Sequence, residues 1–184
     1  MTIKYDRLML DLETMGLPPT GAIVQIGACF FDMETCTIGP RFNRAVHLAS
    51  SVELGMVMEP STVLWWLRQS PDAQKAICFN LVTIRSALDD FRAFINEHSR
   101  EKDVHVYGNG AAFDLTILGA AYKLAGQDAP WSFGRERCFR TLRNLYPQFD
   151  INDTPRPGTH HDAADDAEFQ CQHLFRIKKG LAHG

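Results

Sequence analysis

The residues with the clearest capacity for chemistry are two acids that follow the first apolar stretch. Asp11 and Glu13 lie at the end of a short strand predicted over residues 8–12. Side chains two positions apart in a strand point to the same face, so both carboxylates should lie on one side of a sheet. Acid pairs also arise by chance, and a solvated strand end is the ordinary alternative. The pair therefore indicates a site only together with other residues.

Two more acidic segments lie at expected helix starts. Asp114 follows the glycine-flanked Asn109, just beyond a predicted strand, where open α/β sheets bind ligands. An acid there could equally serve to complement the helix dipole. The segment HHDAADDA, from His160 to Ala167, places three aspartates in the first turns of another helix. Its alternative explanation is an acidic helix start with two surface histidines.

Taken together, four of these carboxylates can converge on one point: Asp11, Glu13, Asp114 and Asp166. Oxygen ligands without accompanying cysteines favour Mg²⁺ or Mn²⁺ over zinc. Four acids around one point repel each other, and two divalent cations about 4 Å apart would neutralise them. The set therefore predicts a two-metal site of the kind that serves phosphoryl transfer.

The elements that must position these acids open with a sheet. Strands are predicted over residues 8–12, 23–32 and 42–48, with turn residues between them, which indicates an antiparallel meander. A fourth short strand is expected over residues 104–107. Strands followed by alternating helix and strand, and then by helices, predict an α/β fold: a mixed sheet with helices on both faces.

Helices are expected from Pro60 and from Pro71, because proline favours the first helical position. Apolar residues at helical spacing predict further helices over residues 83–98 and 113–124, and Gly126 is expected to end the second of these. Residues 135–146 are expected to form a basic helix, residues 153–159 an irregular loop, and residues 162–178 the last helix.

Composition narrows the class of protein. The 184 residues are 45% hydrophobic and 22% charged with a formal net charge of −3, so the chain is neither disordered nor a polycation. Five cysteines without a C-x-x-C pair indicate reduced thiols, and no P-loop motif is present. Apolar runs fall far short of the ~20 residues that cross a bilayer, and the first residues do not resemble a signal peptide. We expect one domain over residues 1–184, in the cytoplasm and not in a membrane.

Three motifs in order resemble those of a known superfamily: Asp11-Leu-Glu13, then Asn109-x-x-x-Phe113-Asp114, then His161-x-Ala163-x-x-Asp166. They are similar to the three exonuclease motifs of the DEDD superfamily, in its histidine-containing branch. The stretches DLETMG, WWLRQS and CFRTL look closest to ribonuclease T-like exoribonucleases of the mycobacterial type and to exonuclease A of T-even phages.

The resemblance implies a ribonuclease H-like fold and 3′→5′ release of nucleoside 5′-monophosphates with two Mg²⁺ or Mn²⁺ ions. It makes Asp11, Glu13, Asp114 and Asp166 metal ligands and His161 the general base. An imidazole titrates near neutrality and suits that role.

Substrate contacts are expected at a second set of residues. The resemblance places Thr14 and Met15 against the terminal sugar and base, and Asn109 belongs to the second motif. Phe113 and Trp66 could stack on bases, although core packing is the alternative for at least one residue of the Trp65–Trp66 pair.

A possible phosphate track and the choice of substrate remain open in the sequence. The arginines at 135, 137, 140 and 143 could follow a phosphate backbone or form a solvated helix face. The expected partners are 3′ ends of single-stranded RNA or DNA, with RNA slightly favoured, and relatives imply a possible homodimer. Two other functions compete: a non-catalytic nucleic-acid binding module of the same fold, and a metal-dependent nucleotide phosphohydrolase.

Overall fold

A five-stranded mixed sheet forms the centre of the molecule. The computed structural model describes residues 4–99 and 104–182. The strands lie in the order β3-β2-β1-β4-β5. They are β1 (Arg7–Thr14), β2 (Ile23–Asp32), β3 (Thr37–Ala45), β4 (His105–Gly108) and β5 (Glu136–Cys138). The first three strands form the predicted antiparallel meander, and β4 and β5 extend the sheet in parallel from β1.

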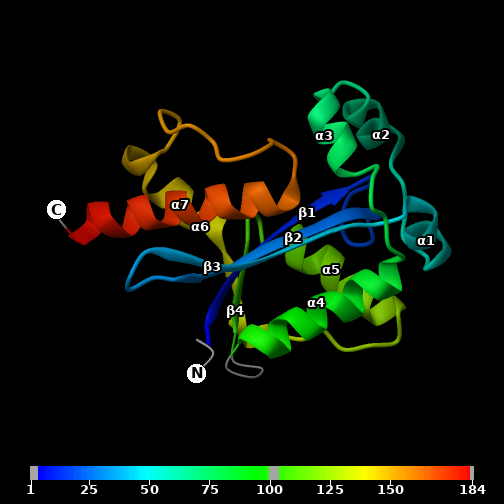
Figure 1. The fold of residues 1–184 in the computed structure, drawn as a ribbon, viewed down its shortest axis with the longest axis horizontal. Helices are drawn as coiled ribbons and strands as arrows, with labels where there is room; N and C mark the ends of the chain where they lie inside the picture. Colours follow the sequence, from blue (N-terminus) through cyan, green and yellow to red (C-terminus); the bar gives the residue numbers. More distant parts are fainter. Residues whose placement is uncertain (1–3, 100–103, 183–184) are drawn as a thin grey trace.

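Helices cover both faces of this sheet, as the sequence predicted (Figure 1). One face is covered by α4 (Ile84–His98) and α5 (Asp114–Leu124), and the other by α6 (Phe139–Leu145) and α7 (Ala163–Ala182). Three short helices lie beside the end of β1: α1 (Leu48–Glu53), α2 (Pro60–Trp66) and α3 (Pro71–Ala76). The 3₁₀ turns η2 (Phe133–Arg135) and η3 (Pro147–Phe149) flank β5 and α6.

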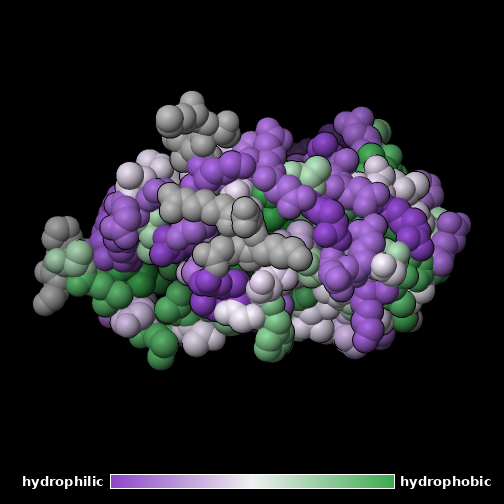
Figure 2. All heavy atoms as spheres, turned by 90° about the horizontal axis from the view of Figure 1, so that it is seen from below, coloured by the Kyte–Doolittle hydropathy of each residue, from purple (hydrophilic) through white to green (hydrophobic). Residues whose placement is uncertain are grey.

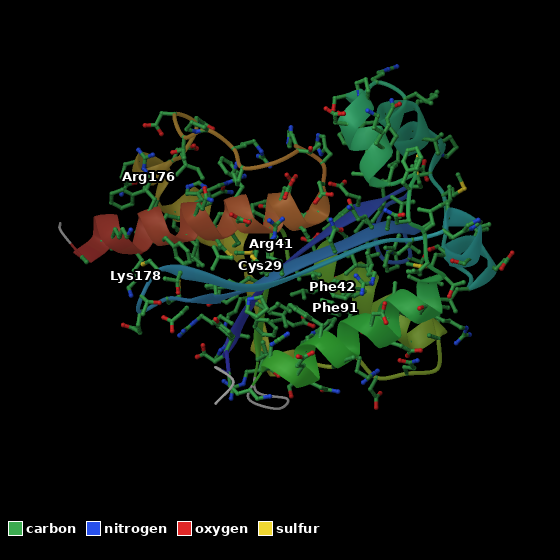
Figure 3. The ribbon with its side chains drawn as sticks, viewed as in Figure 1. Cys29, Arg41, Phe42, Phe91, Arg176 and Lys178 are labelled. Atoms are coloured by element: carbon green, nitrogen blue, oxygen red, sulfur yellow. The ribbon has the colours of Figure 1, made fainter. Side chains whose placement is uncertain are left out.

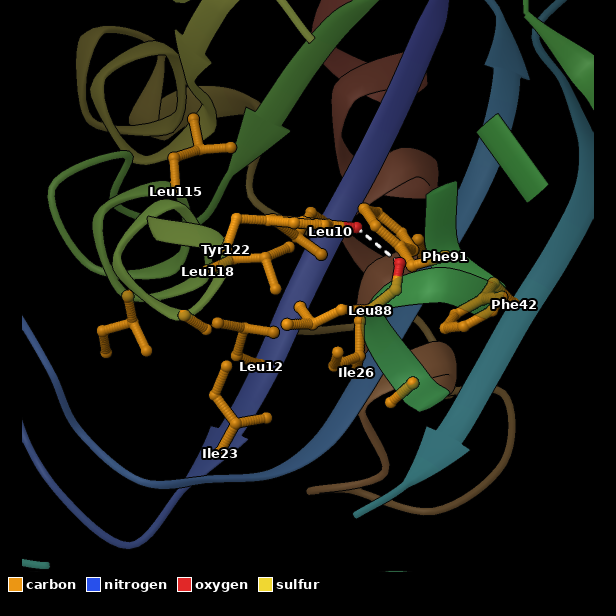
Figure 4. Packing of buried hydrophobic residues seen from close by; sticks show 14 of the residues in the cluster. Leu10, Leu12, Ile23, Ile26, Phe42, Leu88, Phe91, Leu115, Leu118 and Tyr122 are labelled. Atoms are coloured by element: carbon orange, nitrogen blue, oxygen red, sulfur yellow. Dashed lines mark hydrogen bonds between the residues drawn. The ribbon is translucent and has the colours of Figure 1, made fainter. Parts of the chain in front are cut away.

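The alternation of side chains along β1 separates two hydrophobic layers. Leu8, Leu10 and Leu12 are buried against α4 and α5, where the Tyr122 hydroxyl donates to the carbonyl of Leu88 at 2.8 Å (Figure 4). Met9 lies in the second layer, under α7. Odd-numbered side chains of β1 therefore face α7, which determines the direction of Asp11 and Glu13.

The two faces differ in the side chains that fill them. Phe42 of β3 packs on Phe91 of α4 with ring centroids 5.2 Å apart, while Cys29 of β2 points toward α7 (Figure 3). The outer surface on the α4 side is mainly hydrophilic, as expected for an amphipathic helix (Figure 2). The five cysteines are free thiols. Within residues 4–99 and 104–182, every helix falls short of the length and hydropathy needed to cross a bilayer.

The predicted third strand was misplaced. It runs over Thr37–Ala45 instead of residues 42–48, and the unpredicted α1 begins at Leu48. Gly39 and Pro40 concealed its first half, because both residues are rare inside strands. Proline is tolerated here because β3 is an edge strand of the sheet.

The predicted basic helix over residues 135–146 was also wrong in its first part. Residues Glu136–Cys138 form β5, which pairs in parallel with β4, and the helix begins only at Phe139. Pairing with a distant strand overrides local helix preference in such a short segment. The remaining predicted elements are confirmed to within a few residues: the helix predicted over residues 83–98 is α4, with Thr83 as its N-cap, and Gly126 ends α5 in the left-handed conformation.

Candidate active site

The end of β1 carries the first two acids into the interior on the α7 side. Asp11 and Glu13 alternate with the core leucines, so their carboxylates face α7. Asp166 lies in the first turn of α7 and meets them there. Each of the three residues offers an oxygen, and these oxygens lie within 4.8 Å of one another.

The approach of α7 to the sheet depends on a glycine of β2. A Cβ atom on Gly27 would lie 2.1 Å from the carbonyl carbon of Ala163, so only glycine allows the helix start to come this close. Gln25, also on β2, accepts a hydrogen bond from the Ala163 amide at 3.1 Å and donates to Asp162 at 2.9 Å. These contacts fix the helix start against the strand that pairs with Asp11 and Glu13.

The fourth acid comes from the opposite layer of the fold. Asp114 opens α5 and is 3% exposed. Its Oδ1 accepts a hydrogen bond from the backbone amide of Leu12 at 3.2 Å, which attaches it directly to β1 between Asp11 and Glu13. A side chain at position 108 would press on this carboxylate, because a Cβ on Gly108 would lie 2.9 Å from Oδ2.

The four acids repel one another when ionised, and burial adds to the cost of their charge. Burial, together with Asp114, Glu13 and Asp166, raises the pKa of Asp11 well above its usual range, and a hydrogen bond from Gln170 opposes this rise. Burial and neighbouring carboxylates also raise the pKa of Glu13. For Asp114, burial outweighs its backbone hydrogen bonds and raises the pKa to about 7. A cation bound among these groups would offset the repulsion.

A histidine flanks the acids. His161 has a positive φ of 65° and lies just before α7, with Nδ1 3.9 Å from Oε1 of Glu13. Its ring stacks on His160 at 3.8 Å and meets the Trp65 ring edge-on at 4.9 Å. Burial, followed by the charges of His160 and Arg156, lowers the pKa of His161 to about 4. The imidazole is therefore neutral near pH 7, but its pKa lies below the near-neutral titration expected from the sequence, because the site is partly buried and two cationic groups lie close.

All five residues line one pocket of about 360 Å³. Its wall consists of Asp11, Leu12, Glu13, Thr14, Gly16, Leu17, Thr62, Trp65, Trp66, Asn109, Phe113, Asp114, Arg140, His161 and Asp166. A larger hollow of about 550 Å³ between η3 and α7 contains none of these acids. The chemistry therefore lies in the pocket at the end of β1.

Comparison with known proteins agrees with this geometry. The family model described as "3'-5' exoribonuclease Rv2179c-like domain" matches residues 6–177. The chain belongs to this family. A search of curated proteins found no match.

Solved structures share the fold of this Rv2179c-like domain at low sequence identity. Cell-death related nuclease 4 (CRN-4) has a TM-score of 0.64 and 19% identity over 99% of this chain and 66% of its own. The nuclease domain of 3'hExo, a DEDDh family member bound to rAMP, has a TM-score of 0.62 and 15% identity, over 100% of this chain and 96% of its own. E. coli exonuclease I in complex with a dT13 oligonucleotide has a TM-score of 0.68 and 17% identity, over 98% of this chain and 42% of its own. The fold is thus the ribonuclease H-like fold of 3′ exonucleases, and this chain spans under half of exonuclease I.

The expected substrate contacts are placed unevenly in the Rv2179c-like pocket. Asn109 and Phe113 line it, whereas Met15 packs against the core. Thr14 is buried, and its hydroxyl donates to the carbonyl of Gly16 at 2.8 Å. Trp66 is only 4% exposed, and its indole Nε1 donates to the carbonyl of Thr14 at 2.9 Å. Its ring therefore supports the β1 end and offers little surface for stacking.

Sequence reasoning missed the more accessible tryptophan. Trp65 is 40% exposed, lines the pocket and contacts His161. The sequence predicted core packing for at least one residue of the pair Trp65–Trp66, but it did not say which, and Trp66 was taken as the substrate contact. Leu17, 58% exposed in the loop after β1, was missed as well.

The four arginines considered as a phosphate track, at 135, 137, 140 and 143, lie in different surroundings. Of the four, only Arg140 lines the pocket, where its guanidinium lies against Gly110 and offsets part of the rise that burial causes in the pKa of Asp114. Arg135 contacts Nε2 of His105 at 2.9 Å, and Arg137 donates to backbone carbonyls of its own turn. Because β5 replaces the start of the expected helix, the four arginines do not share one helix face.

Proposed function

We propose that this domain removes nucleotides one at a time from the 3′ end of single-stranded RNA, in a reaction that depends on Mg²⁺ or Mn²⁺. The observation that carries the proposal is the convergence of Asp11, Glu13 and Asp166 to within 4.8 Å, in one pocket with His161. Family membership gives the reaction type, 3′→5′ exonuclease, and the description of the family as exoribonucleases favours RNA.

The donor set suits hard divalent cations. The pocket supplies carboxylate oxygens and no thiolate, which favours Mg²⁺ or Mn²⁺ over zinc. Asp11, Glu13 and Asp166 would hold one ion, and Asp114 would share in the binding of a second beside Asp11. When bound, such cations neutralise the carboxylates and stabilise the charge on the oxygen that departs from phosphorus.

His161 is the proposed general base. It is neutral near pH 7, so a free ring nitrogen can take the proton of the water that attacks the terminal phosphodiester, although burial lowers its pKa and thereby weakens it as a base. Its ring is fixed between His160 and Trp65 and faces the carboxylate of Glu13. Proton transfer to His161 then leaves the hydroxide to form the new P–O bond as the 3′ oxygen of the shortened strand departs.

The rest of the pocket would bind the strand without reading its sequence. Trp65 and Phe113 offer ring faces for the terminal base, since stacking is tolerant of base type. Arg140, on the Asp114 side, can pair with a backbone phosphate. Asn109 lies beside them and supplies a polar side chain to the sugar.

A time course on labelled RNA and DNA of matched sequence, each with a 3′ overhang, tests the proposal. With Mg²⁺ the RNA should shorten to nucleoside 5′-monophosphates faster than the DNA, and EDTA should stop both reactions. Asp11→Asn and His161→Ala serve as inactive references. Strands that are bound but never shortened would indicate a binding module, and phosphate released from free nucleotides with intact polymer would indicate a phosphohydrolase.

A further inference from the structure

A buried amide outside the three motifs touches the acid cluster. Gln170 lies one helical turn beyond Asp166 on α7 and is 7% exposed. Its amide Nε2 donates to Oδ1 of Asp11 at 2.7 Å. This hydrogen bond connects β1, which carries Asp11, to α7, which carries Asp166. Asp11 and Asp166 themselves are not joined by a backbone hydrogen bond.

The orientation of this amide follows from the chemistry of its partner. A carboxylate only accepts hydrogen bonds, so the nitrogen of Gln170 must face Asp11. Its Oε1 is then buried without a hydrogen-bond partner among the described residues. A neutral amide orients the carboxylate without adding charge to the cluster, whereas a lysine or arginine in this place would compete with a bound cation.

We propose that Gln170 is a positioning residue for metal binding: it holds the Asp11 carboxylate where it meets Glu13 and Asp166 around one cation. This inference rests on the metal site of the proposed function. Hydrogen-bond partners behind metal ligands fix ligand orientation, and their loss typically costs about 10–100-fold in metal affinity or activity. Gln170 is the described side chain that donates to Asp11, so its removal leaves that carboxylate free to rotate.

The test measures Mn²⁺ binding by electron paramagnetic resonance in the absence of nucleic acid. Gln170→Met keeps the length of the side chain and removes the donor together with the unpaired oxygen. We expect its Mn²⁺ dissociation constant to rise at least about tenfold. The melting temperature without metal should stay well above the assay temperature, so that weaker binding does not report unfolding. The Mn²⁺ concentration for half-maximal exonuclease rate should rise in parallel, while the rate at saturating Mn²⁺ stays within a few-fold of wild type.

Gln172→Met is the matched control, because it makes the same change on α7 in the hollow beside η3. It should bind Mn²⁺ like wild type. In ¹⁵N-labelled wild type, the side-chain amide signals of Gln170 should shift on Mg²⁺ saturation and those of Gln172 should not. Unchanged Mn²⁺ affinity in Gln170→Met, or an unmoved Gln170 signal, overturns the inference. Wild-type protein that binds no Mn²⁺ would instead overturn the proposed function.

Discussion

The two sides of the pocket are built in different ways. On one side, Asp11, Glu13 and Asp114 come from regular elements; Glu13 and Asp114 are buried and Asp11 is half-buried, and pairing of β1 with β2 fixes the backbone of Asp11 and Glu13. On the other side, His161 lies on the segment that precedes α7, partly exposed and in a left-handed conformation.

Ion pairs add to the ring contacts that hold that second side. Arg156, on the same irregular segment as His161, pairs with Asp166 and lies 4.2 Å above the ring of Phe169. Farther from the site, Asp153 pairs at 2.6 Å with Arg176 of α7, which is labelled in Figure 3. Ion pairs at partly exposed sites contribute little stability each. The acid side is therefore the rigid one, and substitutions on the two sides should affect different steps.

The largest effect is expected on the acid side, from Asp11→Asn. The variant loses a proposed metal ligand with no change in size, so the rate should fall by about 10⁴-fold, as expected when several kcal/mol of transition-state stabilisation are lost. Mn²⁺ binding should weaken in step. The melting temperature without metal should stay equal or rise, because one repelling charge is removed. A variant that keeps wild-type Mn²⁺ affinity would remove Asp11 from the metal site.

His161→Ala should separate the two sides. Loss of a general base typically costs about 10²–10⁴-fold in rate, and we expect about 10³-fold. Mn²⁺ affinity measured without substrate should change by less than about twofold, because the three converging carboxylates remain. A parallel loss of Mn²⁺ binding would make His161 a ligand instead of a base.

His160→Ala is the control for that experiment. His160 stacks on His161 at 3.8 Å but matches no position of the three motifs. Its removal should lower the rate by less than about tenfold, through looser placement of His161. A loss as large as that of His161→Ala would transfer the role of base to His160.

The exposed tryptophan should govern affinity for the strand and not the chemical step. Stacking of a base on an aromatic ring is worth about 1–3 kcal/mol, so Trp65→Ala should raise KM for a single-stranded oligonucleotide about tenfold or more. Trp66→Phe, in contrast, removes the hydrogen bond to Thr14 and should lower the melting temperature with a smaller effect on KM. The opposite pattern would show that Trp66 contacts the substrate.

The same contrast separates what the sequence could predict from what it could not. β1, β2 and the helix start at Asp114 followed from apolar patterning and turn residues, and the spacing of Asp11 and Glu13 put both on one face. The convergence of the acids was expected from their places at strand ends and helix starts, and Asp11, Glu13 and Asp166 do converge. These features could be predicted because, in a regular helix or strand, the local sequence pattern determines where each side chain points.

The remaining features depend on tertiary contacts. β5 forms because its three residues pair with β4, and no local sequence pattern predicts this pairing. The contact of Gln170 with Asp11 joins residues 159 positions apart, and glutamine carries no motif. Which ring of Trp65–Trp66 faces the pocket, and where Arg156 points, depend on how α2 and the segment before α7 pack on the sheet.

The smallest expected effect concerns Arg156 and has the opposite sign. Its guanidinium donates to Oδ1 of Asp166, one of the three converging acids, so a cation that binds there must compete with it. Removing the competitor in Arg156→Gln should tighten Mn²⁺ binding about fivefold, the factor that corresponds to an ion pair of roughly 1 kcal/mol. The gain should shrink in high salt, which screens the pair.

Arg41→Gln distinguishes displacement from a general effect of charge. Arg41 pairs with Asp165 and Glu168, the neighbours of Asp166 on the outward side of α7, at 2.5 and 3.0 Å. Both variants remove one positive charge near the start of the same helix, but only Arg156 contacts a carboxylate of the cluster. If Arg41→Gln tightened Mn²⁺ binding equally, the gain would come from net charge. If Arg156→Gln weakened binding, Arg156 would hold Asp166 in place as Gln170 is proposed to hold Asp11, and both sides of the pocket would then depend on the same kind of support.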